Sequence, residues 1–111
     1  MQEQRTEDLK ERVLTLKELV GYQEGAVVSR MVVFKAAGTI TVFSFDAGEG
    51  LSEHTAPYDA VLTVLEGTVE VAIAGKAFRL KEGETIILPA HKPHALTALQ
   101  RFKMMLTMIH D

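Results

Sequence analysis

The spacing of apolar residues changes near residue 27. From there to the end of the sequence, short apolar runs are separated by glycine-containing turns about every ten residues, which is typical of an all-β sandwich or barrel. The predicted strands cover residues 27–34, 39–45, 60–66, 68–74, 76–80, 85–89, 94–99 and 102–109. Their connections are too short for crossover helices, so we expect antiparallel sheets.

Two of these segments are apolar on both faces. Residues 68–73 alternate, with the apolar residues Val69 and Val71 on one face, as in a strand with one buried side. Residues 39–45 and 102–109 instead carry apolar side chains on both faces, which indicates that their outer face is covered too. A second copy of the chain would supply that cover, and we therefore expect a homodimer.

Before residue 27 the helical signal lies in residues 6–20, where Thr6 is the expected N-cap. The apolar residues at helical spacing are Leu9, Val13, Leu16, Leu19 and Val20. The β-branched Val13 would equally suit a short edge strand. We expect residues 1–26 to form an arm, with a short helical or edge segment, that packs on the barrel of residues 27–111 or on the dimer partner.

Composition and charge restrict the partners. The chain has 111 residues, enough for one domain, and carries 12 basic and 15 acidic side chains with no basic cluster, which argues against a nucleic-acid partner. The N-terminal residues lack the apolar core of a signal peptide, and the most apolar region is interrupted by Arg30 and Lys35, so we expect no membrane span. There is no cysteine, which fits a reducing compartment and leaves His, Asp and Glu as metal ligands. We expect a cytoplasmic protein whose partner is a small molecule or another protein.

Two histidines stand at a spacing that resembles a known motif. Gly48 is followed after five residues by His54, and Gly83 is followed after five residues by a proline and then by His94. In this order, the two segments resemble the two halves of the cupin signature. The resemblance covers about residues 27–109 and implies a double-stranded β-helix, the jelly-roll barrel of the RmlC-like cupins. It also implies that His54 and His94 face each other inside the barrel.

This chain departs from the metal-binding cupins at two ligand positions. Ala56 stands where they have a second histidine, and Ala60 stands where they have glutamate. Asp59 is adjacent to Ala60 but belongs to the opposite face of a regular strand. His91 replaces a glycine of the motif, at a turn where histidine tolerates the left-handed backbone better than most residues. Neither His91 nor His110 is expected in the site.

The two retained histidines leave two interpretations open. His54 and His94, completed by water or substrate, would form a weak site for a divalent metal (Zn²⁺, Ni²⁺, Fe²⁺, Mn²⁺ or Cu²⁺), because structural zinc sites use four protein ligands and catalytic ones usually three. In the other interpretation, the imidazoles are hydrogen-bonding groups in a cavity without an ion, and the two alanines leave space for an organic molecule. The predicted ligand-binding residues are His54, His94, Ala56, Ala60, Leu62 and Met104. Ordinary core packing is the alternative for Met104.

Three functions are consistent with these residues. The first is a binding module for a small carboxylated or phenolic molecule. The second is a metal-dependent cupin enzyme of the oxygenase, isomerase or decarboxylase type, in which His54 and His94 are metal ligands or acid–base groups. The third is a dimerising scaffold without catalysis. The missing ligands count against the metal-dependent enzyme. The scaffold is disfavoured because Pro93 restricts the backbone before His94 and so orients its imidazole, which suggests a specific role.

Overall fold

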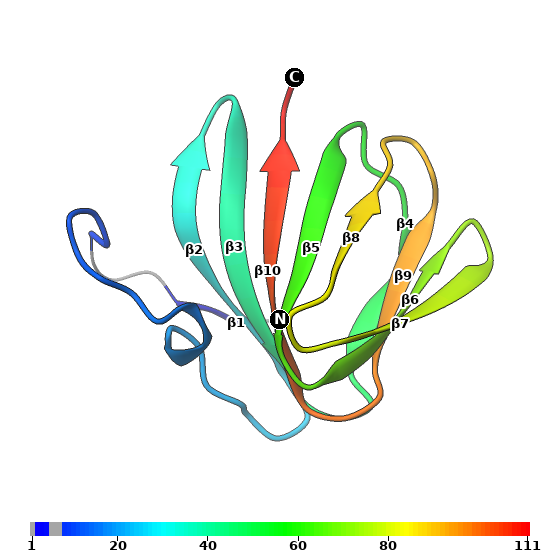
Figure 1. The fold of residues 1–111 in the computed structure, drawn as a ribbon, viewed down its shortest axis with the longest axis horizontal. Coiled ribbons are helices and arrows are strands. Elements are labelled where there is room, and N and C mark those ends of the chain that lie inside the picture. Colours follow the sequence, from blue (N-terminus) through cyan, green and yellow to red (C-terminus); the bar gives the residue numbers. More distant parts are fainter. Residues whose placement is uncertain (1, 5–7) are drawn as a thin grey trace.

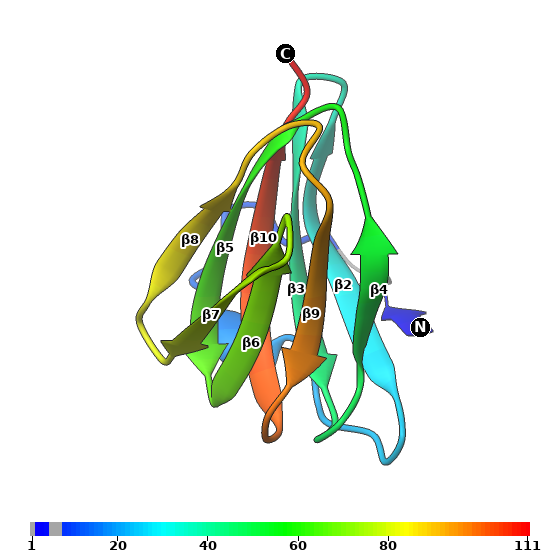
Figure 2. The ribbon, with the colours of Figure 1, turned by 90° about the vertical axis from the view of Figure 1, so that its right-hand side faces the viewer.

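A computed structural model describes residues 2–4 and 8–111 of the chain. Over this range the strands form two sheets packed against each other, seen in Figure 1 and, from the side of the smaller sheet, in Figure 2. The six-stranded sheet has the order β1 (Gln2–Gln4), β2 (Val27–Lys35), β3 (Gly38–Phe45), β10 (Phe102–Ile109), β5 (Asp59–Glu66) and β8 (Thr85–Leu88). The four-stranded sheet has the order β4 (Gly50–His54), β9 (His94–Ala98), β6 (Thr68–Ile73) and β7 (Lys76–Lys81). The predicted all-β jelly roll is confirmed.

All eight predicted strands form, and each observed end lies within one residue of its prediction. Every paired neighbour among β2 to β10 is antiparallel, as expected, whereas β1 runs parallel to β2. The apolar pattern misses β4, because four of its five residues are exposed and its last three are polar. Within the described residues, the single helical element is the 3-10 turn η1 (Leu16–Glu18), and no helix is long and apolar enough to span a membrane.

The core lies between the two sheets. Inward-facing side chains of β3, β10 and β5 meet those of β6 and β9, and the cluster includes Phe45, Phe102, Leu62, Val69 and Val71, all 0% exposed. The rings of Phe45 and Phe102 stack with centroids 4.6 Å apart. The alternation predicted for residues 68–73 is confirmed, because Val69 and Val71 are buried in this cluster and Ile73 packs against it.

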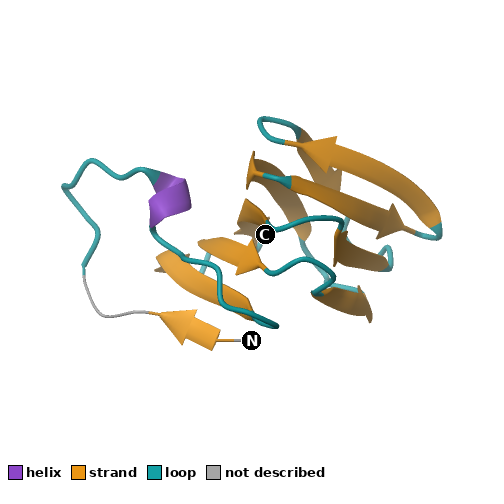
Figure 3. Ribbon diagram, turned by 90° about the horizontal axis from the view of Figure 1, so that it is seen from below, coloured by secondary structure: helices purple, strands orange, loops and turns teal. Residues whose placement is uncertain are grey.

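Of the helical signal in residues 6–20, the described residues 8–20 form only the short turn η1; Thr6, the expected N-cap, lies outside the described residues. Residues 8–15 follow turns and loop, and Val13 is fully exposed, so the predicted apolar stripe is not one buried face. The helical part of the arm is limited to η1, which Figure 3 shows beside the strands. An isolated helix of this length is marginal in water. The conformation of this segment therefore depends on its packing against the sheet. Val20 is buried with Val28 and Val42 on the outer face of the six-stranded sheet, and Leu16 and Leu19 pack beside them.

The ring of Tyr22 holds the end of the arm against the six-stranded sheet. Its hydroxyl donates to Glu66 Oε2 at 2.5 Å. The charged groups of Lys103 and Arg101 lie 4.9 and 5.2 Å from the ring centroid, within the range of a cation–π contact. Burial raises the pKa of Tyr22 above its usual value, and the hydrogen bond to Glu66 raises it further, so the phenol stays protonated and remains a donor.

A second set of polar contacts joins the arm to the end of β3. Arg101 Nε donates to Asp46 Oδ1 at 2.8 Å, and the backbone N–H of Gly25 donates to Asp46 Oδ2 at 2.7 Å. The hydrogen bond from Arg101, followed by that from Gly25, lowers the pKa of Asp46 to about 2. The hydroxyl of Ser44 also donates to the carbonyl of Gly21 at 2.8 Å. The arm is therefore tied to the sheet by polar contacts as well as by apolar packing.

Candidate functional site

His54 and His94 lie directly opposite each other in adjacent strands. His54 ends β4, His94 begins β9, and the two are paired in the register of the four-stranded sheet. Figure 2 shows these strands side by side. The imidazole centroids are 4.4 Å apart and the ring planes form an angle of 67°, an edge-to-face arrangement. On the other side of β9, His94 is paired with Ile73 of β6. Two histidines 40 positions apart are thus brought into contact.

The backbone fixes the same tautomer in both rings. His54 Nδ1 lies 2.8 Å from the carbonyl oxygen of Ser52, and His94 Nδ1 lies 3.2 Å from that of Lys92. Because a carbonyl oxygen only accepts hydrogen bonds, each Nδ1 carries the proton. In the neutral ring this leaves the lone pair on Nε2, which can accept a hydrogen bond or coordinate a metal. These two hydrogen bonds were not predicted from the sequence. The one signal they share is that each histidine stands two residues after the residue whose carbonyl it contacts.

Burial distinguishes the two imidazoles. His94 is 7% exposed, whereas His54 is exposed. Burial lowers the pKa of His94 below its usual value and the nearby His54 lowers it further, while the hydrogen bond to the Lys92 carbonyl opposes both. His94 is therefore an uncharged imidazole at neutral pH.

The two alanines lie at the same end of the barrel as the histidines. Ala60 begins the inward-facing row of β5 and is 4% exposed, whereas Ala56 lies in the loop between β4 and β5. The carbonyl of Ala56 accepts a hydrogen bond from the His91 N–H at 2.8 Å. His91 has φ of +68°, which confirms the left-handed turn predicted for it. The loop before His94 is thus fastened to the loop after His54.

Asp59 does not join this group. It is exposed and is paired with Ile109, whereas Ala60 is buried and is paired with Met108, so the two side chains lie on opposite faces of β5, as the sequence indicated. One carboxylate oxygen of Asp59 accepts the backbone N–H of Ala90 at 2.8 Å. This bond is a further tie between the two loops.

Leu62 and Met104 lie deeper than the alanines. Both are 0% exposed and belong to the main core cluster. Met104 is paired with Val64, four residues along β10 from Met108, a distance of roughly 14 Å at about 3.4 Å per residue. Along these two strands, Ala60 and Leu62 therefore lie nearer than Met104 to the loop between β4 and β5, and Met104 packs in the interior.

The residues present fit a divalent ion only in part. Within residues 2–4 and 8–111, no group of three or more His, Cys, Asp or Glu side chains is arranged to hold a metal. The two Nε2 atoms supply two ligands, and a tetrahedral ion would need two more from outside the protein. Such an ion would be bound weakly.

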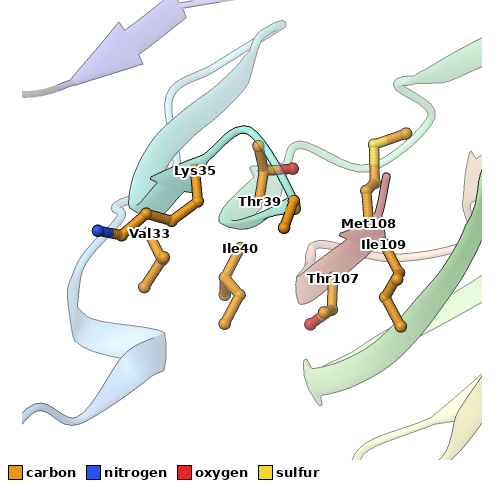
Figure 4. Close-up of a pocket in the computed structure, with 9 residues that line it drawn as sticks. Val33, Lys35, Thr39, Ile40, Thr107, Met108 and Ile109 are labelled. Atoms are coloured by element: carbon orange, nitrogen blue, oxygen red, sulfur yellow. The ribbon is translucent and has the colours of Figure 1, made fainter. Parts of the chain in front are cut away.

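Two hollows are lined by residues other than the two histidines. One, of about 290 Å³, is lined by residues of β2, β3 and β10, including Val33, Ile40 and Ile109 (Figure 4). The other, of about 220 Å³, is lined by Pro57, Asp59, Ala90, Ile109 and Asp111. One sequence signal is consistent with the first hollow, because residues 39–45 and 102–109 are apolar on both faces.

Comparisons with known proteins agree with this architecture. Residues 41–110 match the family model described as a cupin domain. A crystal structure of a conserved protein of unknown function from Streptococcus pyogenes is 38% identical, with a TM-score of 0.86 over 91% of this chain and 89% of that one. A cupin superfamily protein from Desulfitobacterium hafniense is 30% identical, with a TM-score of 0.88 over 97% of this chain and 100% of that one. A cupin 2 conserved barrel domain protein from Leptotrichia buccalis is 43% identical, with a TM-score of 0.84 over 86% of this chain and 47% of that longer chain. A search of curated proteins gave no match.

Proposed function

The chain belongs to the cupin family, and from that premise we propose that it is a small cytoplasmic protein that binds a small molecule beside His54 and His94. The observation that carries this proposal is the pair of imidazoles 4.4 Å apart, each with its Nδ1 atom held by a backbone carbonyl. Each neutral ring thereby keeps its lone pair on Nε2, where it can accept a hydrogen bond from a guest. Ala56 and Ala60 are small side chains at the same end of the barrel, and in this proposal they leave room for the guest beside the rings.

The chemistry of the two rings favours a guest that donates hydrogen bonds. A neutral imidazole whose Nδ1 is already a donor can only accept at Nε2. His94 is neutral because burial lowers its pKa. A hydroxyl group, above all an acidic phenolic one, is a suitable partner, and a carboxylate on the same molecule would keep its contact with water beside the exposed His54. We therefore propose a phenolic or carboxylated molecule as the ligand.

A thermal-shift titration with 4-hydroxybenzoate, which carries both groups, tests this proposal. The melting temperature of the protein rises with the concentration of a ligand that binds only the native state. The rise should disappear in His54→Ala and in His94→Ala, and it should persist in His91→Asn, which keeps a residue that tolerates the left-handed turn. Equal shifts in all four proteins would show that the histidines are not the site. Native mass spectrometry of untagged protein would identify a molecule retained from the cell.

A weakly held divalent ion is a second candidate, favoured by two adjacent imidazoles whose Nδ1 atoms are both bonded to backbone carbonyls. Metal-bound histidines commonly donate their other ring N–H to a carbonyl or carboxylate, as both rings do here. Elemental analysis of untagged protein, without added metal, tests it. A stoichiometric divalent ion that is lost in His94→Ala would support a metal-dependent cupin. Protein that is free of metal and does not bind added Ni²⁺ would exclude the ion and leave the organic guest.

A further inference from the structure

A lysine completes the row of the four-stranded sheet that contains the two histidines. In the register of this sheet, His54 of β4 is paired with His94 of β9, His94 with Ile73 of β6, and Ile73 with Lys76 of β7. Figure 2 shows these four strands side by side. Because directly paired residues share one face of a sheet, the four side chains lie on the same face. The row therefore has two imidazoles at one end and an ammonium group at the other.

This face of the sheet is the one that points into the barrel. Ile73 packs against the main core cluster, and so does Phe78, two residues after Lys76 on β7. Residues two apart on a strand point to the same side. The ammonium nitrogen of Lys76 lies 5.2 Å from the centroid of the Phe78 ring, within the range of a cation–π contact. The lysine side chain therefore extends over the inner face of the sheet.

The backbone fixes the position of Lys76. Ala74 and Gly75 connect β6 to β7 with φ of +49° and +84°, and a type I′ turn requires positive φ at both of these positions. This two-residue turn sets the register of the hairpin. The N–H of Ala74 also donates to the carbonyl oxygen of Pro93 at 2.8 Å, so the hairpin tip is bonded to the residue before His94. The lysine and the buried imidazole are thus held by one connected backbone.

The charge of Lys76 is not neutralised by a carboxylate of the chain. None of the ion pairs in the described part of the chain includes this lysine, whereas Arg79 of the same strand is paired with Glu70 at 3.3 Å on the outer face. The formal net charge of the chain is -3 at pH 7, so an anionic guest is repelled by the protein as a whole. Such a guest gains most from a local cation that has no other partner.

Resting on the proposed function, we infer that Lys76 binds the carboxylate of the small molecule whose hydroxyl group donates to His94. Two strand spacings separate the backbones of these two residues, about 10 Å at roughly 4.8 Å each. A molecule with its hydroxyl and carboxylate on opposite sides of an aromatic ring suits this span, because the flexible lysine side chain covers the remaining distance. The ring would lie across the apolar side chain of Ile73.

Charge decides between two orientations of this guest. With the hydroxyl at His94, the carboxylate lies either beside His54 or beyond Ile73 at Lys76. Beside His54 it keeps its water, but it also lies near the acidic Glu53, the residue directly before that histidine. At the lysine it gains a charge-assisted hydrogen bond, which is stronger than a neutral one. The second orientation is therefore favoured, and Lys76 selects hydroxy acids over uncharged phenols.

Isothermal titration calorimetry with 4-hydroxybenzoate and 4-hydroxybenzamide tests this inference. The two probes share the phenolic hydroxyl, but the amide has no charge. Lys76→Gln should weaken the binding of 4-hydroxybenzoate about fivefold, the upper range for one exposed ion pair, and should leave the affinity for 4-hydroxybenzamide unchanged. Lys76→Arg keeps the cation and should keep the preference for the carboxylate. Added salt should weaken the binding of 4-hydroxybenzoate more than that of the amide.

Lys81→Gln is the matched control, because it removes the same charge from β7 but on the outer face, where Lys81 is paired with Thr68. This variant should bind both probes as the wild type does. Equal losses of 4-hydroxybenzoate affinity in Lys76→Gln and Lys81→Gln would assign the effect to net charge and overturn the inference. Binding that requires His94 but not Lys76 would also overturn it, while the proposed function would stand. A wild type that binds neither probe, or an affinity unchanged in His94→Ala, would overturn both.

Discussion

His94 lies directly opposite His54 in the β4–β9 ladder, yet only His94 is buried. The two rings have the same tautomer and the same type of backbone anchor, so burial is the main difference between them. Their centroids are 4.4 Å apart, close enough for a charge on one ring to disfavour a charge on the other. His94 is therefore the ring whose lowered pKa keeps it neutral, and His54 is the ring in contact with water.

The first prediction concerns the pH dependence of stability. The pKa of His94 is lowered in the folded protein, mainly by burial, so between that value and the unfolded value near 6.5 the unfolded chain binds more protons. The free energy of unfolding should therefore fall as the pH drops below about 6.5, and this loss should end below the native pKa. His94→Asn keeps a side-chain donor for the Lys92 carbonyl but does not titrate. Urea unfolding at several pH values should show a flatter profile for His94→Asn than for the wild type, and identical profiles would contradict the assignment.

The second prediction concerns the missing ligands. Ala56→His adds a third imidazole at a position where metal-binding cupins have one, and should tighten Ni²⁺ binding by about tenfold or more, equivalent to about 1.4 kcal/mol. Isothermal titration calorimetry measures the affinity. Ala77→His, on the exposed edge strand β7, is the control for adding a histidine anywhere on the surface. If both variants bind Ni²⁺ equally, Ala56 does not face the histidine pair.

Most of the fold was predictable because two local signals agree with it. Glycines at positive φ mark the turns, for example Gly67 at +81° and Gly83 at +87°, and alternation marks the strands between them. The arm was not predictable in the same way. Its apolar residues are spaced as in a helix, but Val13 is exposed while Val20 is buried against Val28. Which apolar residue is buried depends on contacts with the outer face of the sheet, and the local spacing does not contain that information.

The pairing of the two histidines was predictable from the sequence, but the chemistry of their rings was not. The resemblance to cupins brings His54 and His94 together, and the register confirms that they are paired. The carbonyls of Ser52 and Lys92 determine which imidazole nitrogen is free in each ring. The positions of these carbonyls depend on backbone angles rather than on residue types. Likewise, Met104 is of the right type for a cavity wall, but its position along β10 places it in the core.

The third prediction concerns the attachment of the arm. Tyr22→Phe removes the hydroxyl that donates to Glu66 while keeping the ring under Lys103 and Arg101. The loss should lower the free energy of unfolding by about 1 kcal/mol, the usual value for one hydrogen bond. Chemical denaturation measures it. Tyr58→Phe is the matched control, because the ring of Tyr58 packs on His110 and is kept. A loss in Tyr58→Phe as large as in Tyr22→Phe would show that the bond to Glu66 contributes nothing specific.

The fourth prediction separates backbone strain from steric overlap at two glycines. Gly67 and Gly75 have nearly the same conformation, with φ of +81° and +84°, so alanine at either position costs about 1–2 kcal/mol of backbone strain. A Cβ at Gly75 meets nothing within 4 Å. At Gly67 it would overlap the carbonyl oxygen of Arg101 and lie 2.7 Å from the Cβ of Phe102.

The surroundings of Gly67 cannot move aside, because Phe102 is 0% exposed and its ring stacks on Phe45. Overpacking of this kind adds roughly 1–3 kcal/mol. Gly67→Ala should therefore lose about 3 kcal/mol or more of unfolding free energy, whereas Gly75→Ala should lose only the strain common to both. Urea unfolding of the two variants, compared at equal denaturant slope, measures the difference. Equal losses would mean that β5, β6 and β10 are packed less tightly at this turn than the structure shows.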